Sequence, residues 1–305
     1  MFGWLRRSWR TAYERLLERE LTGAPTHVAV IQDGNRRYAA EHGTEASDGH
    51  RAGADTTESV LRWCGELGVE ELTLYAFSTE NFQRPPDERE TLFDLISDKL
   101  RSFADHEEVH ARGVRIRTIG ETERLPPRVR EAIEYAERRT ADHDELYLNV
   151  ALAYGGRAEL LGVAREIAAD AAAGALDPEA VDVDEIERRL TTRPTQAVDL
   201  IIRTGGDERT SNFLPWHANG NEAAVYFCTP YWPEFSRVDF LRAIRTYQSR
   251  QESWRQTRAR RATALLRAVG DSELEEARRI VSRLREHAPE PIEDDTDEST
   301  EQSAD

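Results

Sequence analysis

The sequence predicts an α/β fold in which a mostly parallel central sheet of about six strands is flanked by helices within a single domain. Short apolar runs, typical of buried strands, alternate with longer segments whose apolar residues recur at helical spacing. No internal repeat and no linker-like stretch interrupts this alternation. At 305 residues the chain can bury one large core, or at most two, so we expect one domain with terminal tails.

The expected strands are short and rich in valine, isoleucine and leucine, as strands buried on both faces of a sheet are. They are 26–32, 71–77, 114–119, 146–152, 199–203 and 224–228. The expected helices carry apolar residues every three or four positions. They are 36–42, 53–67, 88–111, 127–140, 156–173, 183–190, 237–250 and 254–285. Because ligands of parallel sheets bind beyond the carboxyl ends of the strands, we expect the functional residues there.

The run HVAVIQDGNRRYA joins the first expected strand to the first expected helix through an Asp-Gly turn. Backbone N–H groups at a helix N-terminus face anions, and the guanidinium groups of Arg36 and Arg37 can bind phosphate oxygens in pairs. Asp33 can hold a magnesium ion that shares those oxygens. The segment therefore indicates a diphosphate site. Taken alone, it is equally well explained as a strand capped by a turn with solvated arginines.

The composition is strongly acidic, with 58 acidic against 41 basic residues and a formal charge of −17. Lys99 is the only lysine. An acidic, lysine-poor surface stays hydrated in strong salt, so we expect a halophilic archaeal source; an acidic cytosolic protein from a GC-rich genome is the alternative. The negative field argues against general nucleic-acid binding. Cys64 and Cys228 lie in apolar surroundings, which favours packed thiols over a disulfide or a metal site.

The two ends of the chain differ from the expected domain at 25–287. Residues 1–24 predict an amphipathic helix, which either lies in a membrane interface or docks on the domain. Residues 288–305 are acidic and almost free of large apolar side chains, so we expect disorder. No apolar stretch approaches the roughly 20 residues of a membrane span, and no signal-peptide pattern is seen. We therefore expect a cytoplasmic protein, with peripheral contact at the inner face of the cell membrane if the helix is interfacial.

Five sequence blocks, in this order and at these separations, resemble the cis-prenyltransferases, the family of undecaprenyl and dehydrodolichyl diphosphate synthases. They are DGNRR from Asp33, GHRAG from Gly49, EELTLYAFSTENFQR from Glu70, VDLIIRTGGDERTSN from Val198 and YWPEF from Tyr231. The resemblance implies sequential condensation of isopentenyl diphosphate onto an allylic diphosphate primer, which makes a polyprenyl diphosphate precursor of a lipid carrier. It also implies Mg²⁺, a hydrophobic tunnel for the isoprenoid, and a homodimer.

The resemblance assigns two groups of residues to two diphosphates. The first anion site, for the allylic diphosphate, consists of Gly34, Asn35, Arg36, Arg37, His50 and Arg84. The second anion site, for isopentenyl diphosphate, consists of Arg203, Arg209, Thr210 and Ser211. Read without the resemblance, His50 is a packed helix-start residue, Arg84 is a solvated loop residue, and the second group is an ordinary helix cap near Asp207.

The remaining assignments concern the reacting atoms. By resemblance, Asp33 and Glu222 bind magnesium, and Asp33 promotes departure of the diphosphate. Asn81 lies near the proton that is lost, and it orients water or diphosphate because an amide is a poor base. Further substrate contacts are expected from the same strand end and from two aromatic residues that form a wall for the isoprenoid. They are Ser78, Thr79 and Glu80, and Tyr38 and Phe82.

Three positions depart from the family pattern. Ala46 stands where an arginine is frequent, so one contact to the allylic phosphate is missing unless Arg36 replaces it. Gln32 stands where methionine is usual, directly before Asp33. Glu222 has the family's spacing from Trp216, but two more residues than in the family separate it from the following Tyr-Phe pair. The segment HANGNEAA therefore resembles a short insertion.

The expected helix 88–111 is the natural wall of the tunnel, but the sequence does not separate tunnel-facing from core-facing side chains. Its apolar residues are Leu92, Phe93, Leu95, Ile96, Leu100 and Phe103. The primer is geranylgeranyl or farnesyl diphosphate, and the product length is not readable. A non-catalytic partner subunit is the alternative, which retention of Asp33, Asn81 and the arginine pairs disfavours. A third interpretation is an unrelated phosphate-binding hydrolase. It is disfavoured because this sequence contains no G-x-S-x-G or Walker A motif.

Overall fold

The computed structural model describes residues 2–190, 197–218, 223–254, 256–257 and 260. The chain divides into two compact units, residues 1–251 and 252–305. The sheet and every site residue discussed below belong to the first unit. The expected helix 254–285 and the acidic tail 288–305 lie almost wholly outside the described residues, and so does Glu222.

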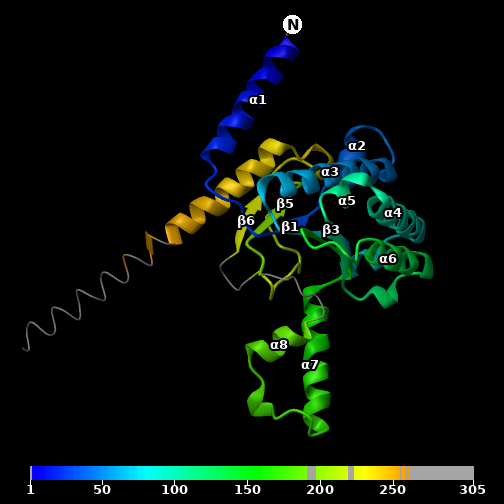
Figure 1. Ribbon diagram of the computed structural model, residues 1–305. Coiled ribbons are helices and arrows are strands. Elements are labelled where there is room, and N and C mark those ends of the chain that lie inside the picture. Colours follow the sequence, from blue (N-terminus) through cyan, green and yellow to red (C-terminus); the bar gives the residue numbers. More distant parts are fainter. Residues whose placement is uncertain (1, 191–196, 219–222, 255, 258–259, 261–305) are drawn as a thin grey trace, which may run out of the picture. The chain divides into compact units, whose positions relative to one another are not determined.

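A six-stranded sheet forms the centre of the first unit (Figure 1). Its strands are β1 (His27–Ile31), β2 (Glu71–Ser78), β3 (Val114–Ile119), β4 (Leu146–Tyr154), β5 (Leu200–Arg203) and β6 (Ala224–Phe227). The strand order is β3-β4-β2-β1-β5-β6, and every neighbouring pair is parallel. All six strands were predicted, and the mostly parallel sheet is confirmed as wholly parallel in the described part of the chain. After β1 the chain moves outward on one side to β2, and it returns on the other side at β5.

Helices and short 3-10 turns connect the strands. The helices are α1 (Phe2–Glu20), α2 (Asn35–Glu41), α3 (Ala46–Leu67), α4 (Pro86–Asp105), α5 (Glu107–Ala111), α6 (Pro127–Arg139), α7 (Gly156–Ala172) and α8 (Val183–Arg189). Residues 237–254 are also helical. The 3-10 segments are η1 (Thr79–Gln83), η2 (Thr122–Arg124), η3 (Pro178–Ala180) and η4 (Trp232–Glu234).

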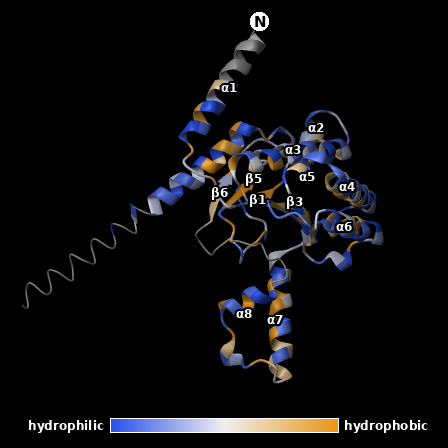
Figure 2. Cartoon of the chain, in the orientation of Figure 1, coloured by the Kyte–Doolittle hydropathy of each residue, from blue (hydrophilic) through white to orange (hydrophobic). Residues whose placement is uncertain are grey.

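Successive strand residues pack on opposite faces of the sheet, as the two-residue period of a strand requires. Val28 and Val30 of β1 belong to a large core that includes apolar residues of α3, α4, α6 and the helix from residue 237. Ala29 and Ile31 face a second cluster that contains Tyr154 and Phe213. Figure 2 shows hydrophobic and hydrophilic residues mixed along the helices around the sheet, which is typical of helices that cover a core on one side.

Two helix boundaries differ from the prediction. α3 begins at Ala46 rather than at residue 53, because Glu45 and Asp48 form a capping box around its first turn. The GHRAG block therefore lies inside a helix, and His50 is not a helix-start residue. The expected helix 88–111 is divided into α4 and α5, because His106 is extended and caps α5 by accepting the N–H of Glu108.

The second half of α1 docks on the domain. Leu17 is fully buried in a cluster with Val238 and Leu241. Arg237 forms ion pairs with Glu18 of α1 and Glu66 of α3. These contacts support the docked alternative for residues 11–20. None of the helices in the described part of the chain combines the length and apolar content that a membrane crossing needs.

Candidate active site

The candidate site lies where β1 and β5 end side by side, at the point where the chain changes direction across the sheet. Ile31 pairs with Arg203, so the residues that follow the two strands are brought together. The hydroxyl of Thr204 accepts the Asp33 N–H at 3.1 Å and donates to the Asp33 carbonyl oxygen at 2.7 Å. Thr204 therefore fixes the backbone of Asp33 to the end of β5. This crevice beyond the carboxyl ends is where parallel sheets bind ligands.

Both oxygens of the Asp33 carboxylate receive an arginine. Arg203 donates to Oδ2 at 2.7 Å, and Arg37 donates to Oδ1 at 3.0 Å. Burial alone would raise the pKa of Asp33, but the hydrogen bonds and charges of Arg203 and Arg37 outweigh burial and lower it. Asp33 is therefore a charged carboxylate at neutral pH, held in a fixed position by groups that also bind phosphates.

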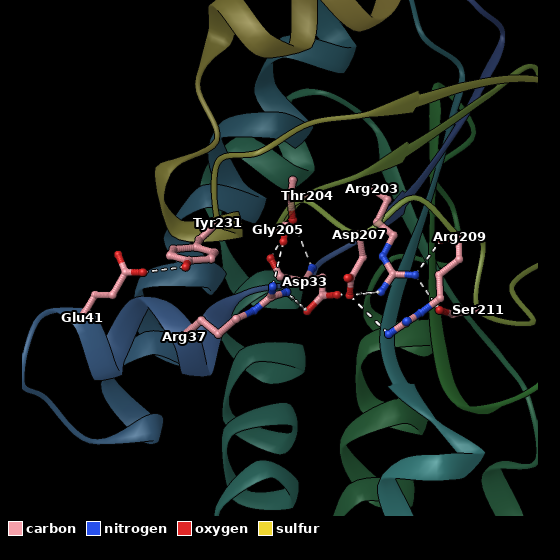
Figure 3. A network of polar contacts seen from close by, with 10 residues as sticks. All are labelled: Asp33, Arg37, Glu41, Arg203, Thr204, Gly205, Asp207, Arg209, Ser211 and Tyr231. Atoms are coloured by element: carbon pink, nitrogen blue, oxygen red, sulfur yellow. Dashed lines mark hydrogen bonds and ion pairs between the residues drawn. The ribbon is translucent and has the colours of Figure 1, made fainter.

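Arg203 organises the second anion site (Figure 3). Its side chain is only 3% exposed, and it contacts Asp33 and, at 3.0 Å, Asp207. Its other amino group donates to the Ser211 hydroxyl and to the Arg209 carbonyl oxygen, both at 2.6 Å. Asp207 also accepts from Arg209 at 3.2 Å. The Arg203 Nε is buried and has no hydrogen-bond partner among the described residues, which leaves this donor of the guanidinium for a ligand.

The turn after β5 depends on unusual backbone conformations. Gly205 has φ +84°, and a Cβ there would lie 2.7 Å from Nη2 of Arg37. Arg37 donates its other amino group to the Gly205 carbonyl oxygen at 2.8 Å. A side chain at residue 205 would therefore push Arg37 away from Asp33. Gly34, with φ +101°, similarly packs against the ring of Tyr231.

The first anion site is built on the glycine face of α3. Gly49 and Gly53 lie one helical turn apart, and a Cβ at either would collide with Asn35 at the start of α2. Their hydrogens let α2 approach α3 closely. Two polar atoms, Oδ1 of Asn35 and Nε2 of His50, are buried there, and neither has a hydrogen-bond partner in the described part of the chain. Buried groups without partners are costly, so they indicate a site for a polar ligand.

Arginine residues surround His50, and Glu88 lies between two of them. Arg84 pairs with Glu88 at 2.7 Å, and the more exposed Arg36 lies 3.7 Å from the same carboxylate. Burial lowers the pKa of His50 to about 4, with a further contribution from the positive charge of Arg84. His50 is therefore neutral at physiological pH, and its ring can donate one hydrogen bond and accept another.

An apolar cavity leads away from this first anion site. Gln32, Asn35 and His50 are among the polar residues that line it, and α4 supplies much of the apolar lining. The α4 residues are Leu92, Leu95, Ile96, Leu100 and Phe103, together with the stem of Lys99. Phe93 is instead buried in the core against Phe77, at 5.3 Å between ring centroids. Five of the six apolar residues proposed for the wall thus line one cavity.

The segment after β2 presents Asn81 in a fixed orientation. Asn81 Oδ1 accepts the N–H of Ser78 at 2.9 Å, in a capping box that starts η1. The amide oxygen is therefore already used, and the amide NH₂ is the part that can contact a ligand. Thr79 lies beside Gly155 at the end of β4, and Glu80 is exposed.

The structure does not gather every predicted site residue. Arg37 contacts Asp33 and Gly205, on the side of the second anion site rather than beside His50. Tyr38 stacks on His42 at 4.1 Å between ring centroids, and Phe82 packs on Phe77 at 5.1 Å; neither lines the cavity. Thr210 is exposed. The apolar wall expected from these two rings is instead formed by other residues, among them Phe103 and leucines of α4 and Trp232.

Three residues with a role in the geometry were not predicted as site residues: Thr204, Glu88 and Asp207. Glu88 and Asp207 each hold two arginines of one anion site. Their spacing gave a signal, because Glu88 lies four residues after Arg84 and Asp207 four after Arg203. The pairing across elements, such as Arg36 with Glu88, has no such signal.

Comparison with known proteins gives a consistent result. Residues 31–255 match the family model of prenyltransferases described as "Putative undecaprenyl diphosphate synthase". Two relatives carry the name tritrans,polycis-undecaprenyl-diphosphate synthase (geranylgeranyl-diphosphate specific). That of Halobacterium salinarum is 68% identical over 291 residues, 94% of this chain and 96% of the relative. That of Haloarcula marismortui is 64% identical over 287 residues, 94% of each chain. These relatives confirm the archaeal, halophilic character predicted from the composition.

Two solved structures share the fold. Lavandulyl diphosphate synthase of Lavandula x intermedia, solved in complex with dimethylallyl diphosphate, is 31% identical with a TM-score of 0.68. The match covers 73% of this chain and 95% of that protein. A protein of Campylobacter jejuni described as a "probable undecaprenyl diphosphate synthase" is 30% identical with a TM-score of 0.60, and the match covers 74% and 96% of the two chains.

Proposed function

The chain belongs to the cis-prenyltransferase family, that of undecaprenyl diphosphate synthases, and we propose that it condenses isopentenyl diphosphate repeatedly onto geranylgeranyl diphosphate. One observation carries the proposal: two arginine-rich anion sites flank one carboxylate, Asp33, and one of them opens into an apolar cavity. A reaction between two diphosphates, one with a long apolar tail, needs this combination. We assign the allylic diphosphate to the site around His50 and isopentenyl diphosphate to the site around Arg203.

The primer is proposed from the relatives and the cavity together. The two haloarchaeal relatives are named for geranylgeranyl diphosphate and for an undecaprenyl product. An apolar cavity lined by residues of α3, α4 and the strands offers a long isoprenoid tail a place beside the first anion site. Farnesyl diphosphate remains the alternative primer, and the competition experiment below decides between them.

Asp33 fits a magnesium ion shared with a diphosphate. Magnesium in proteins is usually held by one or two carboxylates plus substrate phosphates, and Asp33 is a charged carboxylate with arginines on both sides. Among the described residues, no group of three or more metal-ligating side chains gathers, so the diphosphate must supply ligands as well. When bound, magnesium would offset the charge of the diphosphate that leaves the allylic carbon. Glu222 remains a proposed second ligand outside the described residues.

The chain's own groups prepare both substrates. Arg203, with its unused Nε donor, and Ser211 hold isopentenyl diphosphate. Neutral His50 donates a ring N–H, and Asn35 its amide NH₂, to the allylic diphosphate without adding further positive charge. Asn81 donates its amide hydrogens to the departing diphosphate or to water near the proton that isopentenyl diphosphate loses. Retention of these groups favours an enzyme over the alternative of a non-catalytic partner subunit.

The test is an assay of the full chain with labelled isopentenyl diphosphate, magnesium and high salt. Geranylgeranyl and farnesyl diphosphate are offered separately and in competition, and products are separated by chain length. We expect elongation of both with a preference for geranylgeranyl diphosphate, and loss of product when a chelator removes magnesium. No product with either primer would refute the proposed activity, and a preference for farnesyl diphosphate would refute the primer.

Assembly and membrane contact are further parts of the proposal. We propose a homodimer that uses the partly exposed residues Val225–Phe227 of edge strand β6. We also propose that the first half of α1 touches the membrane peripherally, because residues 2–10 combine tryptophan, leucine and arginine. Deleting only residues 2–10 leaves Leu17 in its core cluster. Binding of this variant to anionic vesicles should fall; binding equal to that of the full chain would refute the membrane role.

A further inference from the structure

Asn212 lies where the second anion site meets two other segments. Its backbone carbonyl oxygen accepts the N–H of Gly156 at 3.0 Å, and its side-chain Oδ1 accepts the N–H of Arg157 at 2.9 Å. These are the first two residues of α7. One residue of the loop after β5 thus satisfies two N–H groups that the start of a helix leaves free.

The neighbour of Asn212 belongs to the second anion site. Ser211 receives the Arg203 guanidinium on its hydroxyl at 2.6 Å. Ser211 and Asn212 both have left-handed backbones, with φ of 48° and 60°. Asparagine tolerates this conformation far better than most residues, because its short polar side chain forms local hydrogen bonds. The position of the Ser211 hydroxyl therefore depends on the backbone that Asn212 stabilises.

Asn212 and Thr79 both lie close to Gly155, in the turn between β4 and α7. A Cβ at Gly155 would lie 2.8 Å from the Thr79 hydroxyl and 3.2 Å from Nδ2 of Asn212. The turn between β4 and α7 is thus enclosed by Thr79 on one side and Asn212 on the other. One of the segments at this point, that of Asn212, carries Arg203 and Ser211, which were assigned above to isopentenyl diphosphate.

We propose that Asn212 is a positioning residue for isopentenyl diphosphate: it ties the Arg203–Ser211 pair to the start of α7. The inference rests on the proposed function of the second anion site. This role places two demands on residue 212: its side chain must accept the Arg157 N–H, and its backbone must adopt the left-handed conformation. Aspartate meets both requirements, glycine meets only the second, and alanine meets neither.

The experiment compares Asn212→Asp, Asn212→Gly and Asn212→Ala in the full chain. Calorimetric titration gives the Kd of isopentenyl diphosphate and of the primer separately, so it does not require turnover. We expect the Kd of isopentenyl diphosphate to change less than about threefold for aspartate, and to rise about fivefold for glycine and about 30-fold for alanine. The Kd of the primer should stay within about twofold in all three.

Asp182→Ala is the matched control. Asp182 caps α8 by accepting the N–H of Glu185 at 2.8 Å, so its loss removes a helix cap of the same kind from a helix that carries no predicted site residue. We expect lower thermal stability and an unchanged Kd for both diphosphates. Wild-type affinity of Asn212→Ala for isopentenyl diphosphate, or an equal loss for both diphosphates, overturns the positioning role. A wild-type chain that binds neither diphosphate overturns the proposed function itself.

Discussion

The two anion sites are built from similar residues but differ in how many contacts hold the more buried arginine of each. Arg203 of the second anion site is buried and contacts two carboxylates, a hydroxyl and a carbonyl oxygen. In the first anion site, the more buried arginine, Arg84, pairs with Glu88 at 2.7 Å, and Arg36 is 58% exposed and lies 3.7 Å from the same carboxylate. Within the described residues, both sites leave buried polar atoms without a hydrogen-bond partner, on Asn35 and His50 in the first and on Arg203 in the second. The second site therefore has the more extensively held arginine.

This difference matches the two substrates of the proposed reaction. Isopentenyl diphosphate is the same molecule in every cycle, so its site does not need to adapt to different substrates. A rigid site also reduces the entropy lost when side chains become ordered on binding. The allylic substrate grows by one unit per cycle. Its site must accept one headgroup with tails of many lengths, and it opens into a cavity on the tail side. The following experiments test whether the second anion site is more rigid than the first.

Asp33 lies between the two sites, so its loss should have the largest effect. We expect Asp33→Ala to lower turnover by about a thousandfold or more, because the carboxylate that holds magnesium at the leaving diphosphate is removed. Circular dichroism and thermal melting check that the fold is intact. Turnover close to that of the wild type at saturating magnesium would contradict the metal-binding role.

Lysine substitution should separate the rigid from the loose site. Lysine keeps the charge but not the planar fork, so Arg203→Lys should lose several of its contacts and raise the KM for isopentenyl diphosphate about 100-fold. Arg84→Lys should raise the KM for the primer only about fivefold, because Arg84 has a single recorded carboxylate partner at short range. Steady-state kinetics with each substrate varied in turn provide the values. Equal effects of the two variants on both substrates would show that the sites are not distinct.

The neutral His50 predicts a pH dependence of stability. Its pKa is about 4 in the folded chain and about 6.5 when unfolded, so the unfolded chain binds the extra proton first as the pH falls. The contribution of His50 to stability is therefore complete above pH 6.5 and is lost towards pH 4. Between pH 6.5 and 5, we expect the wild type to lose about 2 kcal/mol more than His50→Gln. Denaturant unfolding at the two pH values measures this difference, and parallel losses would mean that His50 is charged in the folded chain.

Arg36→Ala should give the smallest effect. Its guanidinium is largely exposed and only loosely paired with Glu88, so the KM for the primer should rise less than about threefold. The same kinetic assay, compared with Arg84→Lys, measures it. A rise above tenfold would mean that Arg36 takes over the full role of the arginine that Ala46 replaces.

The sequence predicted the sheet well, and each strand boundary differs from its prediction by at most two residues. Short apolar runs that alternate with helical segments favour buried strands, and the motifs placed Asp33 and Arg203 at strand ends. The sheet order, which the sequence did not predict, makes these two ends neighbours. The start of α3 was missed because glutamate is an uncommon N-cap, although Glu45 and Asp48 form a capping box. Phe93 packs in the core, whereas Leu92 also lines the cavity. Helical spacing does not specify this difference, because it depends on tertiary packing.

The assignment of Arg37 shows the same limit at the site. Its neighbour Arg36 points to Glu88, whereas Arg37 reaches Asp33 and Gly205. Adjacent helical residues differ in direction by about 100°, so two consecutive arginines rarely contact the same ligand. The sequence identified both as phosphate ligands, and only the fold distinguishes their targets.

Glu88 and Asp207 make diphosphate binding an exchange of one anion for another. Each carboxylate already occupies arginines that a diphosphate would take, so binding replaces one anion by another instead of filling a bare positive surface. Attraction between exposed charges weakens steeply with salt, but an exchange of anions changes the local charge less. Chloride at molar concentration must compete for Arg84 or Arg203 with a carboxylate that lies only four residues further along the chain. Binding of a diphosphate to these arginines should therefore depend less on salt than binding to unpaired surface arginines would.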